Sequence, residues 1–175
     1  PNPQLAVTGR RAWIAALAAA WMPLAAVAQD DPGRTNIGRV SVTVYHATDG
    51  DPTVAGSKAA AVGAETAERL RGEKRLRFKS YRTLGQDVQP LLRSYESWAQ
   101  PLKPSDEVLV RFEARSAPTK EVTGLDLELW LSRKKVLKMD ARLEGKRPLF
   151  VLGPQWRGGR LIIAVALAPE KKPGS

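Results

Sequence analysis

The chain holds one histidine, His46, and no cysteine. A Ser-His-Asp triad would have to use His46, and no Gly-x-Ser-x-Gly turn is present to hold a nucleophile. His46 falls on the same side of an alternating strand as Val42 and Val44, at the end of that strand. We therefore expect a structural histidine at the edge of the core, with one hydrogen bond. The absence of cysteine excludes disulfides, thiolate metal sites and a thiol nucleophile.

The acidic residues do not form a recognisable catalytic or metal-binding pattern. Asp49-Gly50-Asp51 lacks the further oxygen ligands of a calcium loop and is typical of a turn. The other candidates are scattered and mostly alternate outward on predicted strands, as solvated side chains do: Glu96, Asp106, Glu113, Asp126 and Glu128. Gly153-Pro154 and Gly158-Gly159 do not precede a helix, so neither predicts a phosphate-binding loop. We expect no cofactor and no metal.

Basic residues outnumber acidic ones, 28 to 18. Without Arg10 and Arg11 of the N-terminal segment, the remaining charge is 26 − 18 = +8. A candidate polyanion patch consists of Arg75, Arg77, Lys79, Arg82, Lys134 and Lys135. Tyr81 or Trp130 on the same face would add stacking to charge. The alternative is that these cations make the surface soluble and protect strand edges from aggregation.

A second candidate contact surface is Trp156, Arg157 and Arg160, within a turn-rich segment between two apolar runs. The runs, Leu149–Leu152 and Leu161–Leu167, predict a β-hairpin at the centre of the core, because continuous apolar strands are buried on both faces. Trp156 either folds back over this hairpin or contacts a partner.

Alternating apolar residues predict the strands that position these side chains. Pro90 and Pro101 argue against a continuous central strand over Val88–Leu102, where Tyr95 and Trp98 are expected to cover the core. Turns are predicted at Gly85–Asp87 and Ser132–Lys134, and one helix at 64–71, ended by Gly72. The predicted strands are Arg39–His46, Leu76–Leu84, Glu107–Ala114, Leu125–Leu131, 137–143 and the two runs of the hairpin. The fold class is mainly β, at the margin of α+β: an antiparallel β-sandwich or curled sheet of about seven strands with one packed helix.

The N-terminal segment has the three parts of a secretory signal peptide. Arg10 and Arg11 precede an apolar run, and Ala26-Val27-Ala28 precedes an expected cleavage after Ala28. A membrane anchor is the alternative, and the paired arginines also resemble a twin-arginine export signal. The expected organisation is a signal peptide at 1–28, a flexible lead-in at 29–38, one β-rich domain at 39–168 and a disordered tail at 169–175. Such a protein is periplasmic or secreted, without a membrane span after cleavage.

The last hundred residues or so resemble a group of uncharacterised exported bacterial proteins. The matching segments are Phe78–Leu84, Pro101-Leu102, Lys135–Leu137, Leu152–Pro154 and Gly159–Ala164. These motifs are structural, and the group has no assigned activity, so the resemblance implies the fold and export and no function.

These patterns favour an exported, non-enzymatic domain that acts in binding or scaffolding in the cell envelope, with an envelope protein or anionic polymer as partner. The alternatives are an envelope hydrolase or carbohydrate-active domain, and a polyanion-binding module. The enzyme alternative needs a carboxylate within hydrogen-bond reach of His46. The polyanion alternative predicts binding that collapses with added salt.

Overall fold

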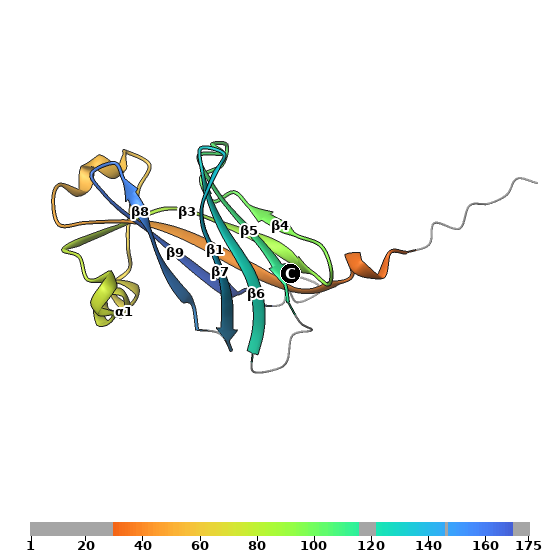
Figure 1. Ribbon diagram of the computed structural model, residues 1–175. Helices are drawn as coiled ribbons and strands as arrows, with labels where there is room; N and C mark the ends of the chain where they lie inside the picture. Colours follow the sequence, from red (N-terminus) through yellow and green to blue (C-terminus); the bar gives the residue numbers. More distant parts are fainter. Residues whose placement is uncertain (1–29, 116–121, 146, 170–175) are drawn as a thin grey trace, which may run out of the picture.

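The protein is a two-layer antiparallel β-sandwich with one α-helix, in agreement with the predicted fold class (Figure 1). The computed structural model describes residues 30–115, 122–145 and 147–169. The expected signal peptide and all but the first residue of the expected tail lie outside the described residues. The strands are β1 (Asn36–Thr48), β2 (Ala60–Ala61), β3 (Ser80–Leu92), β4 (Ser97–Ala99), β5 (Val108–Ala114), β6 (Val122–Leu131), β7 (Lys134–Glu144), β8 (Leu149–Trp156) and β9 (Gly159–Leu167).

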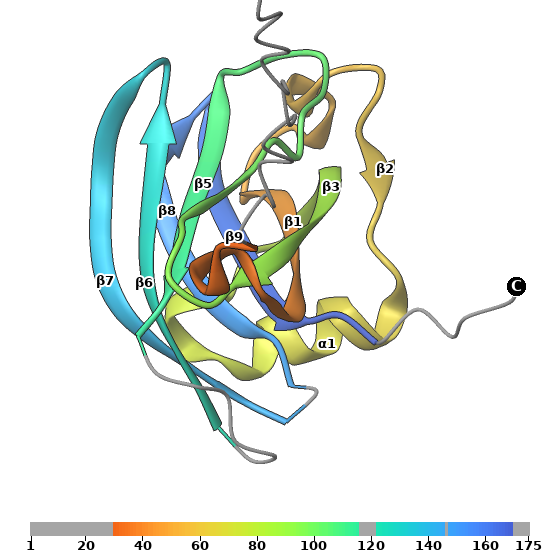
Figure 2. The same cartoon turned by 90° about the vertical axis from the view of Figure 1, so that its right-hand side faces the viewer.

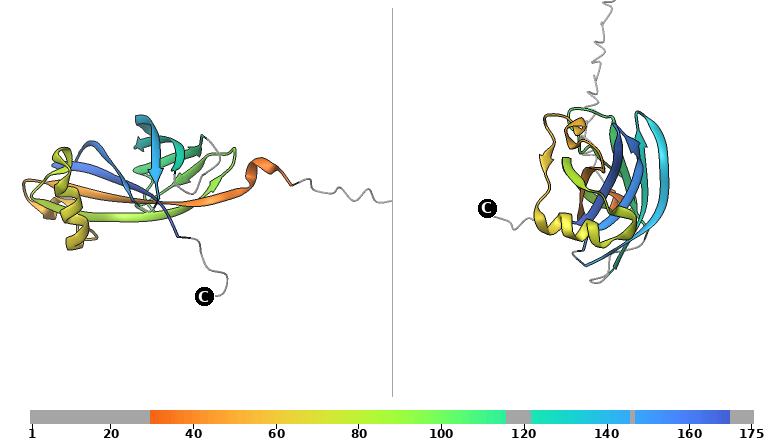
Figure 3. Two further views of the ribbon diagram at one scale, coloured as in Figure 1. Left: turned by 90° about the horizontal axis from the view of Figure 1, so that it is seen from below. Right: turned by 90° about the vertical axis from the view of Figure 1, so that its left-hand side faces the viewer.

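One sheet has five strands in the order β2-β3-β1-β9-β8, and the other has four in the order β4-β5-β6-β7. The two sheets form the two layers seen edge-on in Figure 2. Helix α1 (Ala64–Gly72) lies at one end of the molecule, beside the five-stranded sheet (Figure 3). Among the described residues, no helix has the length and apolar character needed to cross a membrane.

The main core lies between the two sheets, and period-two alternation builds it. Val40, Val42 and Val44 of β1 are fully buried in one cluster with Phe112 of β5. A second cluster forms on the opposite face of the five-stranded sheet, where Leu70 of α1 packs with Ile162 of β9 and its neighbours. Strand β9 is therefore covered on both faces, as its continuous apolar run predicted.

The hairpin of β8 and β9 has a shorter loop than the sequence suggested. Only Arg157 and Gly158 form the turn, and both have positive φ, 45° and 70°. Such two-residue turns match the right-handed twist of the strands they connect. The prediction that the whole hairpin is central was wrong for β8, which is the last strand of its sheet. Its Pro154 lies in an irregular stretch of the ladder, where a missing N–H is tolerated.

Strand β3 contradicts the prediction of a turn at Gly85 and an irregular segment after it. It runs from Ser80 to Leu92 and includes Gly85, a position where the carbonyl of Pro101 leaves no space for a side chain. Pro90 is tolerated because β2 pairs with β3 only at Thr83 and Arg82, so the edge beside Pro90 needs no N–H. The predicted beginning at Leu76 was also wrong, since Lys74–Leu76 form a 3-10 turn. Strand β1 begins three residues earlier than expected, at Asn36, which pairs with Leu92.

Candidate functional site

The residues of the hairpin tip contact the protein itself. Trp156 Nε1 donates a hydrogen bond of 2.8 Å to Glu107 Oε1, at the entrance to β5 in the other sheet. The Arg157 guanidinium lies 4.2 Å from the centre of the Trp156 ring and pairs with the same carboxylate. Arg160 donates to the carbonyl of Gly153. Trp156 thus folds back over the hairpin and links the two sheets.

His46 is fully buried beneath this tip, with its ring edge-on to Trp156 at a centroid distance of 5.8 Å. Neither ring nitrogen has a hydrogen-bond partner in the described part of the chain, so the single hydrogen bond expected for His46 is not formed. Gly159 packs directly against the ring, which leaves no space for a side chain at that position. The contact between His46 and a carboxylate that the enzyme alternative required is likewise not formed among these residues.

The candidate polyanion residues lie in two separate groups. Arg75, Arg77, Lys79 and Arg82 lie before or at the start of β3, whereas Lys134 and Lys135 open β7 of the other sheet. Figures 1 and 2 place the end of α1 and the β6–β7 turn far apart. Tyr81, which was expected to add stacking, is buried and donates its hydroxyl to the carbonyl of Leu76.

The predicted turn at Asp49–Asp51 is present. Asp51 caps a short 3-10 turn by accepting a hydrogen bond from the Thr53 N–H, and Asp49 accepts one from the Lys79 N–H. Both carboxylates therefore stabilise the turn and its neighbouring segment by accepting hydrogen bonds from backbone N–H groups.

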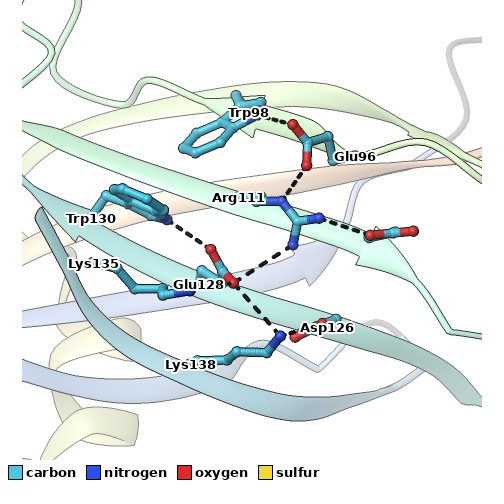
Figure 4. Close-up of polar contacts among 9 residues, drawn as sticks. Glu96, Trp98, Arg111, Asp126, Glu128, Trp130, Lys135 and Lys138 are labelled. Carbon is cyan, nitrogen blue, oxygen red and sulfur yellow. Dashed lines mark hydrogen bonds and ion pairs between the residues drawn. The ribbon is translucent and has the colours of Figure 1, made fainter. Parts of the chain in front are cut away.

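Two tryptophans meet on the outer face of the four-stranded sheet. Trp98 of β4 and Trp130 of β6 have ring centroids 5.6 Å apart and an interplanar angle of 59° (Figure 4). Trp98 Nε1 donates to Glu96 at 3.0 Å, and Trp130 Nε1 donates to Glu128 at 2.9 Å. Because each carboxylate precedes its tryptophan by two residues, both side chains of each pair point to the same face. The expectation that Trp98 covers the core was wrong: it is 38% exposed on the opposite side.

Arg111 of β5 lies between the tryptophan-bearing strands and joins three carboxylates (Figure 4). Its guanidinium contacts Glu96 at 2.5 Å, Glu113 at 2.9 Å and Glu128 at 3.9 Å. The hydrogen bond that Arg111 donates to Glu96 is the main reason that the pKa of Arg111 is raised. The hydrogen bonds from Trp98 and Arg111 lower the pKa of Glu96 in return. Arg111 and Glu96 therefore stay ionised near neutral pH.

Strand β7 supplies two lysines to the same face. Lys135 pairs with Glu128 at 3.2 Å and lies over the Trp130 ring at 5.7 Å. Lys138 pairs with Asp126 at 3.1 Å and approaches Glu128 at 3.7 Å. Burial opposes ionisation of Glu128, but its hydrogen bonds from Trp130 and Lys135, with the nearby cations, hold its pKa below the usual value. Three cations and four carboxylates are thus fixed around the tryptophan pair, which we call the Trp98–Trp130 face.

Comparison with protein-family models, curated proteins and solved structures found no match.

The acidic residues judged scattered in the sequence are mostly gathered here, and that prediction was wrong. Asp106 alone lies elsewhere, paired with Arg133. The register of β5 and β6 sets Arg111 directly opposite Glu128, and the register of β6 and β7 sets Glu128 opposite Lys138. A signal for this was present, because these three residues occupy outward positions of their strands and alternate in charge across them. Trp98 carried no such signal, because β4 has only three residues.

Proposed function

We propose that this chain is an exported, non-enzymatic domain of the cell envelope that binds a glycan on the Trp98–Trp130 face. The observation that carries the proposal is a pair of indoles on an open sheet face, each fixed by a hydrogen bond to its own glutamate. Indole rings offer apolar area for the C–H faces of sugar rings, and fixed carboxylates and cations offer hydrogen bonds to hydroxyl groups. The export part rests on the signal pattern at residues 1–28. Protein recovered from the envelope is expected to begin at Gln29, and an intact N-terminus would contradict export.

The balance of charge favours a glycan over a polyanion. Each cation of the face is paired with a carboxylate of the same face, and the four carboxylates outnumber the three cations. A polyanion binds mainly because cationic side chains of the protein replace its bound counterions, which are released. Cations that are already paired with carboxylates contribute little to this release.

The residue composition of the Trp98–Trp130 face also favours a glycan over a protein as the ligand. The buried centres of protein–protein interfaces are depleted in lysine, glutamate and aspartate. Here such residues surround both tryptophans, and covering them with a protein would desolvate a whole ion-pair network. A hydrated glycan can instead exchange hydrogen bonds with these groups at the surface.

The pKa directions favour binding over hydrolysis. A glycosidase needs one carboxyl group whose pKa is raised, so that it donates a proton at neutral pH. Glu96 and Glu128 have lowered pKa values and stay ionised. They are therefore suited to accept hydrogen bonds from hydroxyl groups.

The test uses a glycan array together with sedimentation of the protein on purified peptidoglycan sacculi and on chitin. We expect retention on at least one of these glycans, without cleavage of the glycan. Retention should persist from about 0.05 to about 0.5 M NaCl, because it does not rest on unpaired cations. Trp98→Ala and Trp130→Ala should each weaken retention by at least about tenfold, which is the effect of losing one aromatic contact.

The matched control is Val54→Ala, at an exposed position in the short 3-10 turn after β1. It should bind as the wild type does, and circular dichroism should show that all variants are folded. The proposal is wrong if no glycan of the panel is retained, or if the tryptophan variants bind normally. Retention that disappears at high salt would point to polyanion binding instead.

A further inference from the structure

A groove of about 540 Å³ runs along the outer edge of β8. One of its walls is the segment that follows α1, with Arg75 and Leu76, and the other is β7 of the opposite sheet, with Leu137 and Met139. A second hollow of about 500 Å³ continues it past Phe150, toward Arg69 and Arg142. The two share Glu73, Pro148, Leu149 and Phe150, so they form one furrow with β8 at its base.

Strand β8 is an edge strand, and among the described residues it pairs only with β9. The outer edge of such a strand carries N–H and C=O groups that can pair with another chain. Proteins often block exposed edges with charged residues or proline, but the stretch Leu149–Leu152 contains neither. Pro148 and Pro154 flank it. The available edge is therefore short and apolar.

The two walls limit what can reach this edge. The segment after α1 and strand β7 line the groove on either side of β8, which favours a narrow segment over a whole sheet as the occupant. A single extended segment fits between them. Its alternate side chains would point to opposite walls, since successive residues of a strand face opposite sides.

The walls differ in chemistry. Leu137 and Met139 make the β7 wall apolar, and both are only partly buried. On the other wall Arg75 is exposed, and Arg69 lies over the Phe150 ring at 5.9 Å. Glu73 lines the groove on this side as well, but within the described residues no carboxylate forms an ion pair with Arg69 or Arg75, and the two arginines outnumber it. An incoming strand would therefore match the groove with apolar side chains on one side and acidic ones on the other.

We propose that β8 accepts an extended segment of a partner protein as an added strand. Apolar residues of this segment would contact Leu137 and Met139, and alternate acidic residues would lie toward Arg69 and Arg75. The net charge of the chain without its N-terminal segment, 26 − 18 = +8, favours such an acidic partner over a second copy of the chain. This site is separate from the Trp98–Trp130 face and does not depend on glycan binding.

The test titrates isotopically labelled protein with short synthetic peptides and follows backbone amide resonances. In one peptide valine alternates with glutamate, and in the other valine alternates with lysine. We expect the valine–glutamate peptide to bind at least about tenfold more tightly and to shift the amides of Leu149–Leu152. N-methylation of alternate backbone amides should abolish this binding, because it removes the donors that pair with β8.

Arg75→Glu should reverse the preference between the two peptides, and it should fold normally because Arg75 is exposed. The matched control is Arg93→Glu, an exposed arginine just after β3, which should leave the preference unchanged. The proposal is overturned if neither peptide binds, if the shifts map to the Trp98–Trp130 face, or if N-methylated peptide binds equally well. Dimers of the protein that dissociate on Arg75→Glu, without peptide binding, would overturn it in favour of a second copy.

Discussion

In the described part of the chain, three indoles each donate a hydrogen bond to a glutamate, and the position of the glutamate distinguishes two regions of the molecule. On the Trp98–Trp130 face, each glutamate lies two residues before its tryptophan, within the same strand or directly before it. At the hairpin tip, Trp156 of the five-stranded sheet bonds to Glu107, which precedes β5 of the other sheet. The first arrangement orients side chains on a surface, whereas the second connects the two layers.

The tryptophans of the two regions also differ in burial. Trp156 packs against the main core and lies edge-on to the buried His46 ring. Trp98 is exposed and contacts Trp130 across β5. The comparison teaches that the same type of hydrogen bond, from an indole to a glutamate, accompanies a structural tryptophan at the tip and an exposed one, Trp98, on the face. We expect substitutions at the tip to lower stability, and substitutions on the face to lower binding.

The largest effect on stability is expected for Trp156→Ala. The change removes a large side chain from the edge of the core and leaves Glu107 without its indole donor. Truncation of a tryptophan in a core costs about 3–5 kcal/mol, and for this half-buried residue we expect about 2–3 kcal/mol. Urea denaturation followed by circular dichroism measures it. A loss below about 0.5 kcal/mol would show that the tip does not connect the sheets.

An intermediate and pH-dependent effect is expected for Glu128→Gln. Glu128 accepts from Trp130 and pairs with Lys135, and its pKa in the folded protein is lowered. A carboxyl group whose pKa is lower in the folded than in the unfolded protein stabilises the fold at pH values above its unfolded pKa, which is near 4.5. This contribution is lost as the pH falls through the pKa of the folded protein. The variant should therefore be less stable than the wild type at pH 7, and the difference should narrow as the pH falls below about 5.

The matched control for this measurement is Glu144→Gln, at an exposed pair with Arg147. Exposed pairs contribute little, so we expect a change below about 0.5 kcal/mol at any pH. A difference between wild type and Glu128→Gln that stays constant from neutral to acid pH would contradict the role given to the ionised carboxylate.

Much of the fold follows from alternation in the sequence. Strands β5, β6 and β7 lie where Val108, Leu127 and Met139 alternate with polar residues, because one face of each strand is buried and the other is solvated. Strand β3 was misread because Gly85 and Pro90 have special surroundings: a carbonyl from another segment at one, and an unpaired edge at the other. Local sequence does not contain either fact.

The candidate site was predictable only in part. The alternation of apolar and polar residues in each strand predicts that Arg111, Glu128 and Trp130 point outward. Their assembly depends on the register between strands, which is set by packing and turns over the whole sheet. The place of β8 at the edge depends on strand order, so its groove had no signal in the sequence.

The most direct test of the proposed function compares Trp98→Ala with Trp156→Ala in two measurements: unfolding by urea and retention on the glycan that the wild type binds. Trp98→Ala should lose less than about 1 kcal/mol of stability, because the side chain is exposed, and should lose retention by about tenfold or more. Trp156→Ala should show the opposite pattern, with lower stability and normal retention under folding conditions. Normal retention by Trp98→Ala, or equal loss of retention in both variants, would contradict a binding site on the Trp98–Trp130 face.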